Sequence, residues 1–322
     1  MLASRAAVIH DRTLVTGAAG FVGSHLLPAL RAAGREVVGV HLPGLPPGAA
    51  DVGWRACDLR DRRAVAALVD EVRPREVVHL AALAAPAEVE RAPLEALRAN
   101  YLALDALLGA LANARLRARF LFVSTGEVYG PSAVGAPPRR ETDELRPHNL
   151  YAATKAAGEA RVQLAVARDG LDARIARPFN HTGPGRPALY AESSFAEQIA
   201  RIERGEQEPV LRVGNLEPVR DFSDVRDVAA AYVVLLSRGE TGATYNVCSG
   251  VSRSMRSVLE RLLARSTARP RVEVDPARFR PLPPDSLAFV GNASRLRALG
   301  WTPTHSVDAA LDALLDAHRD AA

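Results

Sequence analysis

The sequence predicts an α/β fold built around a doubly wound parallel sheet, and two observations support this prediction. Short apolar runs alternate along the chain with alanine-rich segments that favour helix, which is the order expected of strand–helix–strand units. The first apolar run, which ends at Thr16, leads into a glycine-rich turn and then into a predicted helix over residues 24–33. A strand, a glycine turn and a helix in this order are typical of a Rossmann-type sheet.

Composition indicates a globular protein, because 48% of the 322 residues are hydrophobic and 24% are charged. The formal net charge is +4, and the arginines are scattered among acids, so no nucleic-acid-binding stripe is expected.

No apolar run reaches the ~18 residues of a membrane span, and Arg5 and Arg12 interrupt any secretory segment. Cys57 and Cys248 lie far apart without metal-ligand spacing, which predicts reduced thiols, a cytoplasmic location and no metal site.

The glycine-rich turn has the spacing G-x-x-G-x-x-G at Gly17, Gly20 and Gly23. Glycines there permit a tight turn and let the backbone approach a pyrophosphate at the N-terminus of the following helix. The turn therefore predicts a bound dinucleotide. The next predicted strand, residues 36–40, is followed by His41, where an acidic residue would favour NAD and an arginine would favour NADP. Both NAD(H) and NADP(H) stay open.

Only one of the 41 basic residues is a lysine, Lys155, and it lies four residues after Tyr151. Residues i and i+4 share a helix face, and residues 151–167 favour helix after the entry residues Pro147 and Asn149. A nearby ammonium is expected to lower the pKa of the phenol, which would make Tyr151 a general acid or base near neutral pH. An exposed helix face that carries both residues by chance is the alternative interpretation.

Four further segments complete a resemblance to the extended short-chain dehydrogenase/reductase family over nearly the whole chain. They are residues 57–61 (CDLRD), 77–82 (VVHLAA), Asn100 in RANY, and 121–130 (LFVSTGEVYG). The resemblance implies a catalytic triad of Thr125, Tyr151 and Lys155. It also implies cofactor contacts from Gly17, Gly20, Phe21, Val22, Gly23, Asp58, Leu59, Ala81, Ala82, Asn100, Tyr151 and Lys155.

Motifs in the second half narrow the resemblance to the branch that modifies nucleotide sugars. Residues 176–185 (ARPFNHTGPG), 214–228 and 245–250 resemble most closely the GDP-6-deoxymannose reductases of this family. This resemblance implies NAD(P)H-dependent reduction of the C4 ketone of a GDP-4-keto-6-deoxy sugar to GDP-rhamnose. It also implies that Asn180, Arg220 and Asp285 contact the substrate. The arginine that usually precedes the last acid is displaced here to Arg278 or Arg280.

Glu127 leaves other activities open, because 4,6-dehydratases of the family place a proton-abstracting glutamate at this position. Glucose-type dehydratases also carry an aspartate just before it, whereas this chain has Gly126. That difference argues against a glucose-type dehydratase but not against a GDP-mannose dehydratase. A nucleotide-sugar 4-epimerase and a non-catalytic nucleotide-binding protein are further alternatives, and residues 180–185 (NHTGPG) favour the reductase.

We expect two domains. A Rossmann domain covers residues 1–178, residues 222–249 return to it, and a smaller α/β substrate domain covers residues 179–322. The predicted helices around residues 93–114 and 151–167 correspond to those that form a four-helix bundle in dimers of the family. The resemblance therefore implies a homodimer.

Overall fold

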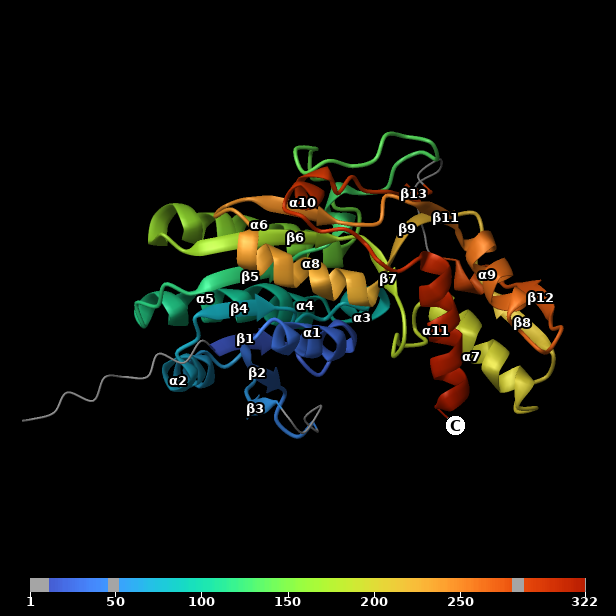
Figure 1. The fold of residues 1–322 in the computed structure, drawn as a ribbon, viewed down its shortest axis with the longest axis horizontal. Helices are drawn as coiled ribbons and strands as arrows, with labels where there is room; N and C mark the ends of the chain where they lie inside the picture. The colour runs from blue at the N-terminus through green and yellow to red at the C-terminus, as the bar shows by residue number, and fades with distance from the viewer. Residues whose placement is uncertain (1–11, 46–51, 280–286, 322) are drawn as a thin grey trace, which may run out of the picture.

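The protein is described by a computed structural model of residues 12–45, 52–279 and 287–321. Its largest element is a seven-stranded parallel sheet with the strand order β10-β6-β5-β4-β1-β2-β3 (Figure 1). The bounds of the strands are β1 (Arg12–Thr16), β2 (Glu36–His41), β3 (Gly53–Ala56), β4 (Glu76–His79), β5 (Arg119–Val123), β6 (Asp172–Pro178) and β10 (Thr244–Val247). The predicted doubly wound α/β fold is confirmed.

Helices cover both faces of this sheet. On one face lie α1 (Phe21–Ala32) and α8 (Val225–Arg238), and on the other lie α2 (Arg62–Val72), α5 (Ala103–Asn113) and α6 (Leu150–Asp169). Successive strand residues point to opposite faces, so Val15 packs in the core under α1 and α8, and Leu14 in the core under α2 and α5. Both faces are buried, which explains why the strands read as continuous apolar runs.

A smaller unit follows the sixth strand (Figure 1). Its four-stranded sheet contains β7 (Asn180–Thr182), β9 (Val219–Asp224), β11 (Ser252–Ser254) and β13 (Ala288–Phe289). A strand pair, β8 (Val210–Val213) with β12 (Arg271–Val274), and the helices α7 (Ala191–Glu203), α9 (Met255–Ala264) and α11 (Val307–Asp320) complete it. The short elements of the chain are α3 (Pro86–Arg91), α4 (Pro93–Leu97), the π-helical turn η1 (Arg98–Leu102), the 3₁₀ turns η2 (Gly126–Tyr129) and η3 (Pro276–Arg278), and α10 (Ser294–Ala298).

The chain returns from the smaller unit to the large sheet through α8 and β10. Helix α8 packs on α1, and β10 pairs with β6 at the edge of the large sheet. Phe222, where we expected the return to begin, lies in β9 and packs in the core of the smaller unit. The domain boundaries themselves stay a prediction.

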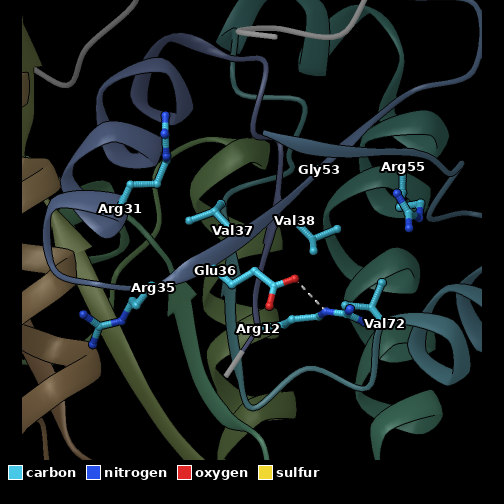
Figure 2. Close-up of a pocket in the computed structure, with 9 residues that line it drawn as sticks. All are labelled: Arg12, Arg31, Arg35, Glu36, Val37, Val38, Gly53, Arg55 and Val72. Carbon is cyan, nitrogen blue, oxygen red and sulfur yellow. Dashed lines mark hydrogen bonds and ion pairs between the residues drawn. The ribbon is translucent and has the colours of Figure 1, made fainter. Parts of the chain in front are cut away.

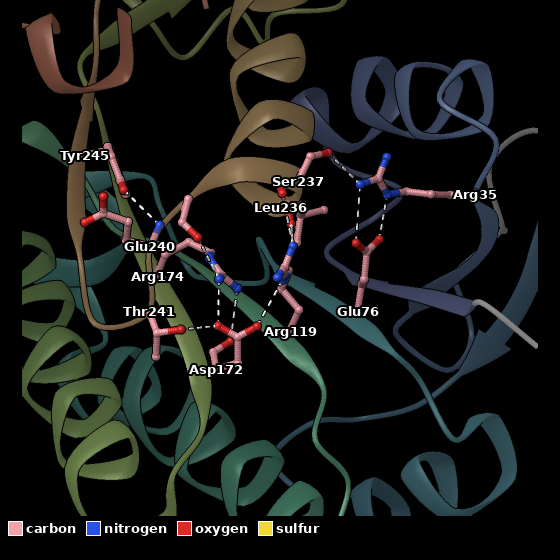
Figure 3. Close-up of polar contacts among 11 residues, drawn as sticks. Arg35, Glu76, Arg119, Asp172, Arg174, Leu236, Ser237, Glu240, Thr241 and Tyr245 are labelled. Atoms are coloured by element: carbon pink, nitrogen blue, oxygen red, sulfur yellow. Dashed lines mark hydrogen bonds and ion pairs between the residues drawn. The ribbon is translucent and has the colours of Figure 1, made fainter. Parts of the chain in front are cut away.

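Arginine–carboxylate pairs join the amino-terminal ends of the central strands (Figure 3). Asp172 at the start of β6 accepts hydrogen bonds from Arg119 of β5 at 3.0 Å and from Arg174 at 2.7 Å. Arg35 pairs with Glu76 of β4 at 2.6 Å. These pairs lie at the opposite end of the strands from the glycine turn. Within the described parts of the chain, no helix combines the length and apolarity needed to cross a bilayer.

Candidate active site

The glycine turn packs directly against the loop that follows β4. Gly17 has a positive φ of 69°, and a Cβ at this position would lie 2.7 Å from the backbone nitrogen of Ala81. A Cβ at Gly23 would lie 2.2 Å from the carbonyl oxygen of Ala18. Side chains at either position would push the turn away from the sheet, so the spacing of the glycines is a packing requirement. Gly20 is the N-cap residue of α1 and lines the same turn.

A cleft with a volume of about 760 Å³ runs from this turn across the carboxyl ends of the strands to the smaller unit. Its size suits a dinucleotide together with a second ligand. Nearly all of the predicted cofactor contacts line it: Gly17, Gly20, Phe21, Val22, Gly23, Asp58, Leu59, Ala81, Ala82, Tyr151 and Lys155. The predicted catalytic Thr125, Glu127 and the predicted substrate contact Asn180 line it too.

Helix α6 carries Tyr151 and Lys155 into the cleft. The Asn149 side chain caps the helix by accepting a hydrogen bond from the backbone nitrogen of Ala152 at 2.8 Å, which fixes where the helix begins. Lys155 is 2% exposed, and its Nζ donates a hydrogen bond to the carbonyl oxygen of Val123 at 2.7 Å. Burial lowers the pKa of Lys155 to about 8, and Glu159 opposes this shift.

We expected the nearby ammonium of Lys155 to lower the pKa of Tyr151, and this expectation is wrong. Burial raises the pKa of this phenol above its ordinary value, and the negative charge of Glu127 raises it further. The Arg186 guanidinium and a hydrogen bond with Thr125 act in the lowering direction, but they are the smaller effects. Tyr151 is therefore a protonated phenol at neutral pH, which suits a proton donor.

Arg186 is a cleft residue that we did not predict. Its side chain is 9% exposed, pairs with Glu192 at 3.2 Å, and stacks on the rings of Tyr190 and Phe21 at 3.4 and 5.2 Å from their centroids. The segment around it is anchored to α1, because a ring nitrogen of His25 lies 2.9 Å from the carbonyl oxygen of Pro184. The sequence offered no signal, because Arg186 is one of many arginines and only the fold directs it toward Tyr151.

Glu127 is held by the entry to α6. The Asn149 side-chain nitrogen donates a hydrogen bond to the Glu127 carboxylate at 2.8 Å and lies 3.2 Å from a ring nitrogen of His148. Burial lowers the pKa of His148, and its ring packs against Phe289 at a centroid distance of 5.4 Å. The carboxylate is thus fixed at the cleft wall, close enough to Tyr151 to influence its ionisation.

Two predicted contacts in the described part of the chain, Asn100 and Arg220, are not among the residues that line the cleft. Asn100 is 1% exposed behind the cleft, where its side chain bonds to the backbone of Leu83 and to the hydroxyl of Thr154 at 3.0 Å. It connects the loop after β4 to α6 and is not among the lining residues. Arg220 lies behind Phe289, 4.7 Å from the centroid of its ring, and donates to the carbonyl oxygen of Leu287 at 2.8 Å. Asp285 and Arg280 lie outside the described residues.

Comparison with known proteins identifies the family. Residues 13–248 match the sequence profile of the NAD dependent epimerase/dehydratase family. The chain belongs to this family.

Among similar family members, the GDP-6-deoxy-D-mannose reductase of Pseudomonas aeruginosa is 36% identical over 95% of this chain and 96% of its own length. The solved structure of RMD from Pseudomonas aeruginosa with NADPH is also 36% identical, with a TM-score of 0.85 over 97% of this chain and 100% of that one. The solved structure of the Thermus thermophilus UDP-glucose 4-epimerase with NAD is 30% identical, with a TM-score of 0.86 over 97% of this chain and 100% of that one.

Within the epimerase/dehydratase family, this chain excludes a side chain at position 126. A Cβ on Gly126 would lie 2.9 Å from the ring of Phe179, which is buried against Tyr129. An aspartate therefore does not fit next to Glu127 unless this aromatic packing changes. The packing of Phe179 therefore disfavours the aspartate–glutamate pair that we associated with glucose-type dehydratases.

A second cavity of about 290 Å³ lies at the amino ends of β1, β2 and β3 (Figure 2). Arg12, Arg31, Arg35 and Arg55 line it, and Arg12 pairs with Glu36 at 2.9 Å. Arg35 and Arg55 pair with glutamates outside the cavity lining. Because carboxylates already pair with three of these arginines, Arg12, Arg35 and Arg55, we assign no ligand to this cavity.

Proposed function

We propose that this protein is an NAD(P)H-dependent reductase of a GDP-4-keto-6-deoxy sugar, with GDP-rhamnose (GDP-6-deoxymannose) as its product. The observation that carries the proposal is one cleft that combines the glycine turn with Thr125, Tyr151 and Lys155. Support comes from a relative named GDP-6-deoxy-D-mannose reductase, which is 36% identical over nearly the full length of both chains.

The cleft fits a nicotinamide dinucleotide. The amide groups of the turn between Gly17 and Gly23 would hold the pyrophosphate at the N-terminus of α1, where the helix dipole favours negative charge. Asp58 and Leu59, in the loop that follows β3, would contact the adenine. Lys155 would hold the hydroxyls of the nicotinamide ribose, and Asn100 would act indirectly by fixing the loop after β4.

The reduced cofactor, when bound, supplies the hydride for C4 of the sugar. Negative charge then develops on the C4 oxygen, and Tyr151 gives this oxygen its proton. The raised pKa of Tyr151 keeps the phenol protonated at neutral pH, as a donor requires. Thr125, which is hydrogen-bonded to Tyr151, donates to the same oxygen. Reduction of the ketone requires a proton donor at this position, and the Tyr151 phenol supplies it.

Substrate recognition would come from the smaller unit. Asn180, at the start of β7, offers an amide to the diphosphate. Arg220 and Asp285 remain our proposed contacts, although Arg220 would have to move past the ring of Phe289 to reach the cleft. Arg186 is a stronger cationic candidate than Arg220 because it lines the cleft directly. A product of this kind places the enzyme in deoxysugar biosynthesis in the cytoplasm, where reduced nicotinamide and sugar nucleotides are available.

A 4,6-dehydratase is the second candidate, because the Glu127 carboxylate lines the same cleft. One assay separates the two activities. Purified protein is supplied with GDP-4-keto-6-deoxymannose and NADPH or NADH, and absorbance of the reduced cofactor is followed. We expect stoichiometric oxidation of the cofactor and a GDP-6-deoxyhexose product. Dehydration of GDP-mannose without net cofactor oxidation would replace the reductase with the dehydratase.

We further propose that the protein forms a homodimer through a four-helix bundle. Leucines on neighbouring helices are exposed on the outer side: Leu94 (68%) and Leu97 (41%) on α4, Leu102 (46%) on η1 and Leu164 (48%) on α6. Helix α4 and η1 both contact α6 in the same molecule. Burial of these leucines against a second copy would remove apolar surface from water.

Light scattering after size-exclusion chromatography tests the dimer. Wild-type protein is expected at twice the mass of the 34.4 kDa chain. The variant Leu97→Glu places a charge in the bundle and is expected to be monomeric, whereas Val274→Glu, at an exposed position (53%) on β12, should leave the dimer intact. A monomeric wild type would contradict the proposal.

A further inference from the structure

Behind the cleft lies a buried ion pair that the sequence analysis did not identify. Arg177, near the end of β6, donates three hydrogen bonds of 2.6, 2.9 and 3.2 Å to the Glu159 carboxylate on α6. Their side chains are 7% and 5% exposed. Neither residue is part of the cleft lining, so the pair is not placed to touch a ligand.

Two side chains, Arg177 and Ser124, fix the position of the carboxylate. Arg177 holds it through these hydrogen bonds, and the hydroxyl of Ser124, the residue before Thr125, donates to the same Glu159 oxygen. Arg177 is itself fixed, because its Nη1 donates to the Tyr129 hydroxyl at 2.7 Å and its guanidinium lies over the Tyr129 ring. A buried carboxylate with this many hydrogen-bond partners stays in place.

Glu159 follows Lys155 by four residues on α6, so the two side chains lie one helical turn apart on the same face. Among the described residues, the other groups that we find around the ammonium supply no negative charge. They are the carbonyl oxygen of Val123, the ring of Phe122 at 5.0 Å, and His79, whose pKa burial lowers to about 3 so that it is neutral. Tyr151, one turn earlier, is also neutral because its pKa is raised.

We propose that Glu159 and Arg177 form a positioning pair for Lys155: Arg177 clamps the Glu159 carboxylate where its charge keeps the buried ammonium protonated. The pair acts through Lys155 and not on the substrate. This inference rests on the proposed role of Lys155 in cofactor binding, but it is independent of which sugar is reduced.

The test is the pH dependence of NADPH binding, measured by fluorescence without any sugar substrate. In the wild type, binding should weaken as pH rises through the pKa of Lys155, about 8. Glu159→Gln keeps the shape of the side chain but removes the charge that raises this pKa. We expect the midpoint to fall by about one pH unit, which makes NADPH binding roughly tenfold weaker than wild type above both midpoints. Glu159→Asp retains the charge and should keep the midpoint near that of the wild type.

Asp172→Asn is the matched control. It breaks the Arg174–Asp172 pair, which lies at the other end of the same strand and also involves a buried arginine, 1% exposed (Figure 3). This variant should lower the thermal unfolding temperature and leave the pH midpoint unchanged. If Glu159→Gln fails to fold because it strands the Arg177 charge, Glu159→Gln with Arg177→Met removes both charges and should show the same lowered midpoint.

A purely structural role would lower the unfolding temperature of Glu159→Gln, as in the control, with the midpoint still at the wild-type value. That result would overturn the inference. Failure of the reductase proposal would appear separately, as absence of cofactor oxidation by the wild-type enzyme.

Discussion

Replacement of Tyr151 by phenylalanine removes the proposed proton donor and keeps the ring in the cleft wall. General acid catalysis contributes about 10²- to 10⁴-fold to a rate, so turnover should fall by this factor. It corresponds to about 3 to 5.5 kcal/mol of activation free energy. Cofactor affinity should stay close to that of the wild type, because the glycine turn and Lys155 are unaltered.

The hydrogen bond between Tyr151 and Thr125 allows the loss of turnover in a double variant to be predicted. Thr125→Val removes one donor to the C4 oxygen, which we expect to lower turnover by about 10²-fold. If the two hydroxyls acted independently, the double variant would lose about 10⁴- to 10⁶-fold. Because Tyr151 and Thr125 are hydrogen-bonded to each other and serve one oxygen, we expect the double variant to lose little more than Tyr151→Phe alone.

Single-turnover oxidation of NADPH with a GDP-4-keto-6-deoxy sugar measures these losses, and fluorescence titration checks cofactor binding. A donor that is protonated at neutral pH also predicts a wild-type rate that does not rise between about pH 6 and pH 8. The reasoning is refuted if Tyr151→Phe turns over within tenfold of the wild type, or if the wild-type rate rises with pH as a phenolate base would require.

Three further variants test the cleft. Lys155→Arg keeps the charge but forces a larger group beside Phe122 and Val123, so turnover should fall at least about 100-fold; full activity would show that charge alone suffices. Gly23→Ala places a Cβ 2.2 Å from a carbonyl oxygen, so NADPH binding should be lost in fluorescence titration, and wild-type affinity would contradict the packing argument. Arg186→Met removes a cation that lines the cleft, so the substrate KM should rise roughly tenfold or more while NADPH affinity changes little; an unchanged KM would exclude Arg186 from substrate binding.

Several features of the fold follow from short stretches of sequence. The apolar runs, the glycine spacing and the Asn149 cap each depend on neighbours within a few residues. For that reason the parallel sheet was predicted correctly, and α6 begins one residue before the predicted start. Prediction was weaker for the smaller unit, because its strands pair across long sequence separations. Phe222, for example, joins the core of the smaller unit and not that of the large sheet.

The sequence by itself determined the sheet, the turn for a dinucleotide and the Tyr151–Lys155 pair, because strand periodicity, glycine geometry and i,i+4 spacing are local properties. Only the tertiary structure decided the ionisation of that pair. Burial raises the pKa of Tyr151 and lowers that of Lys155, since desolvation depends on every element packed around a group. The fold likewise brought Glu159 to Arg177 and Arg186 to Phe21, contacts that no spacing in the chain could reveal.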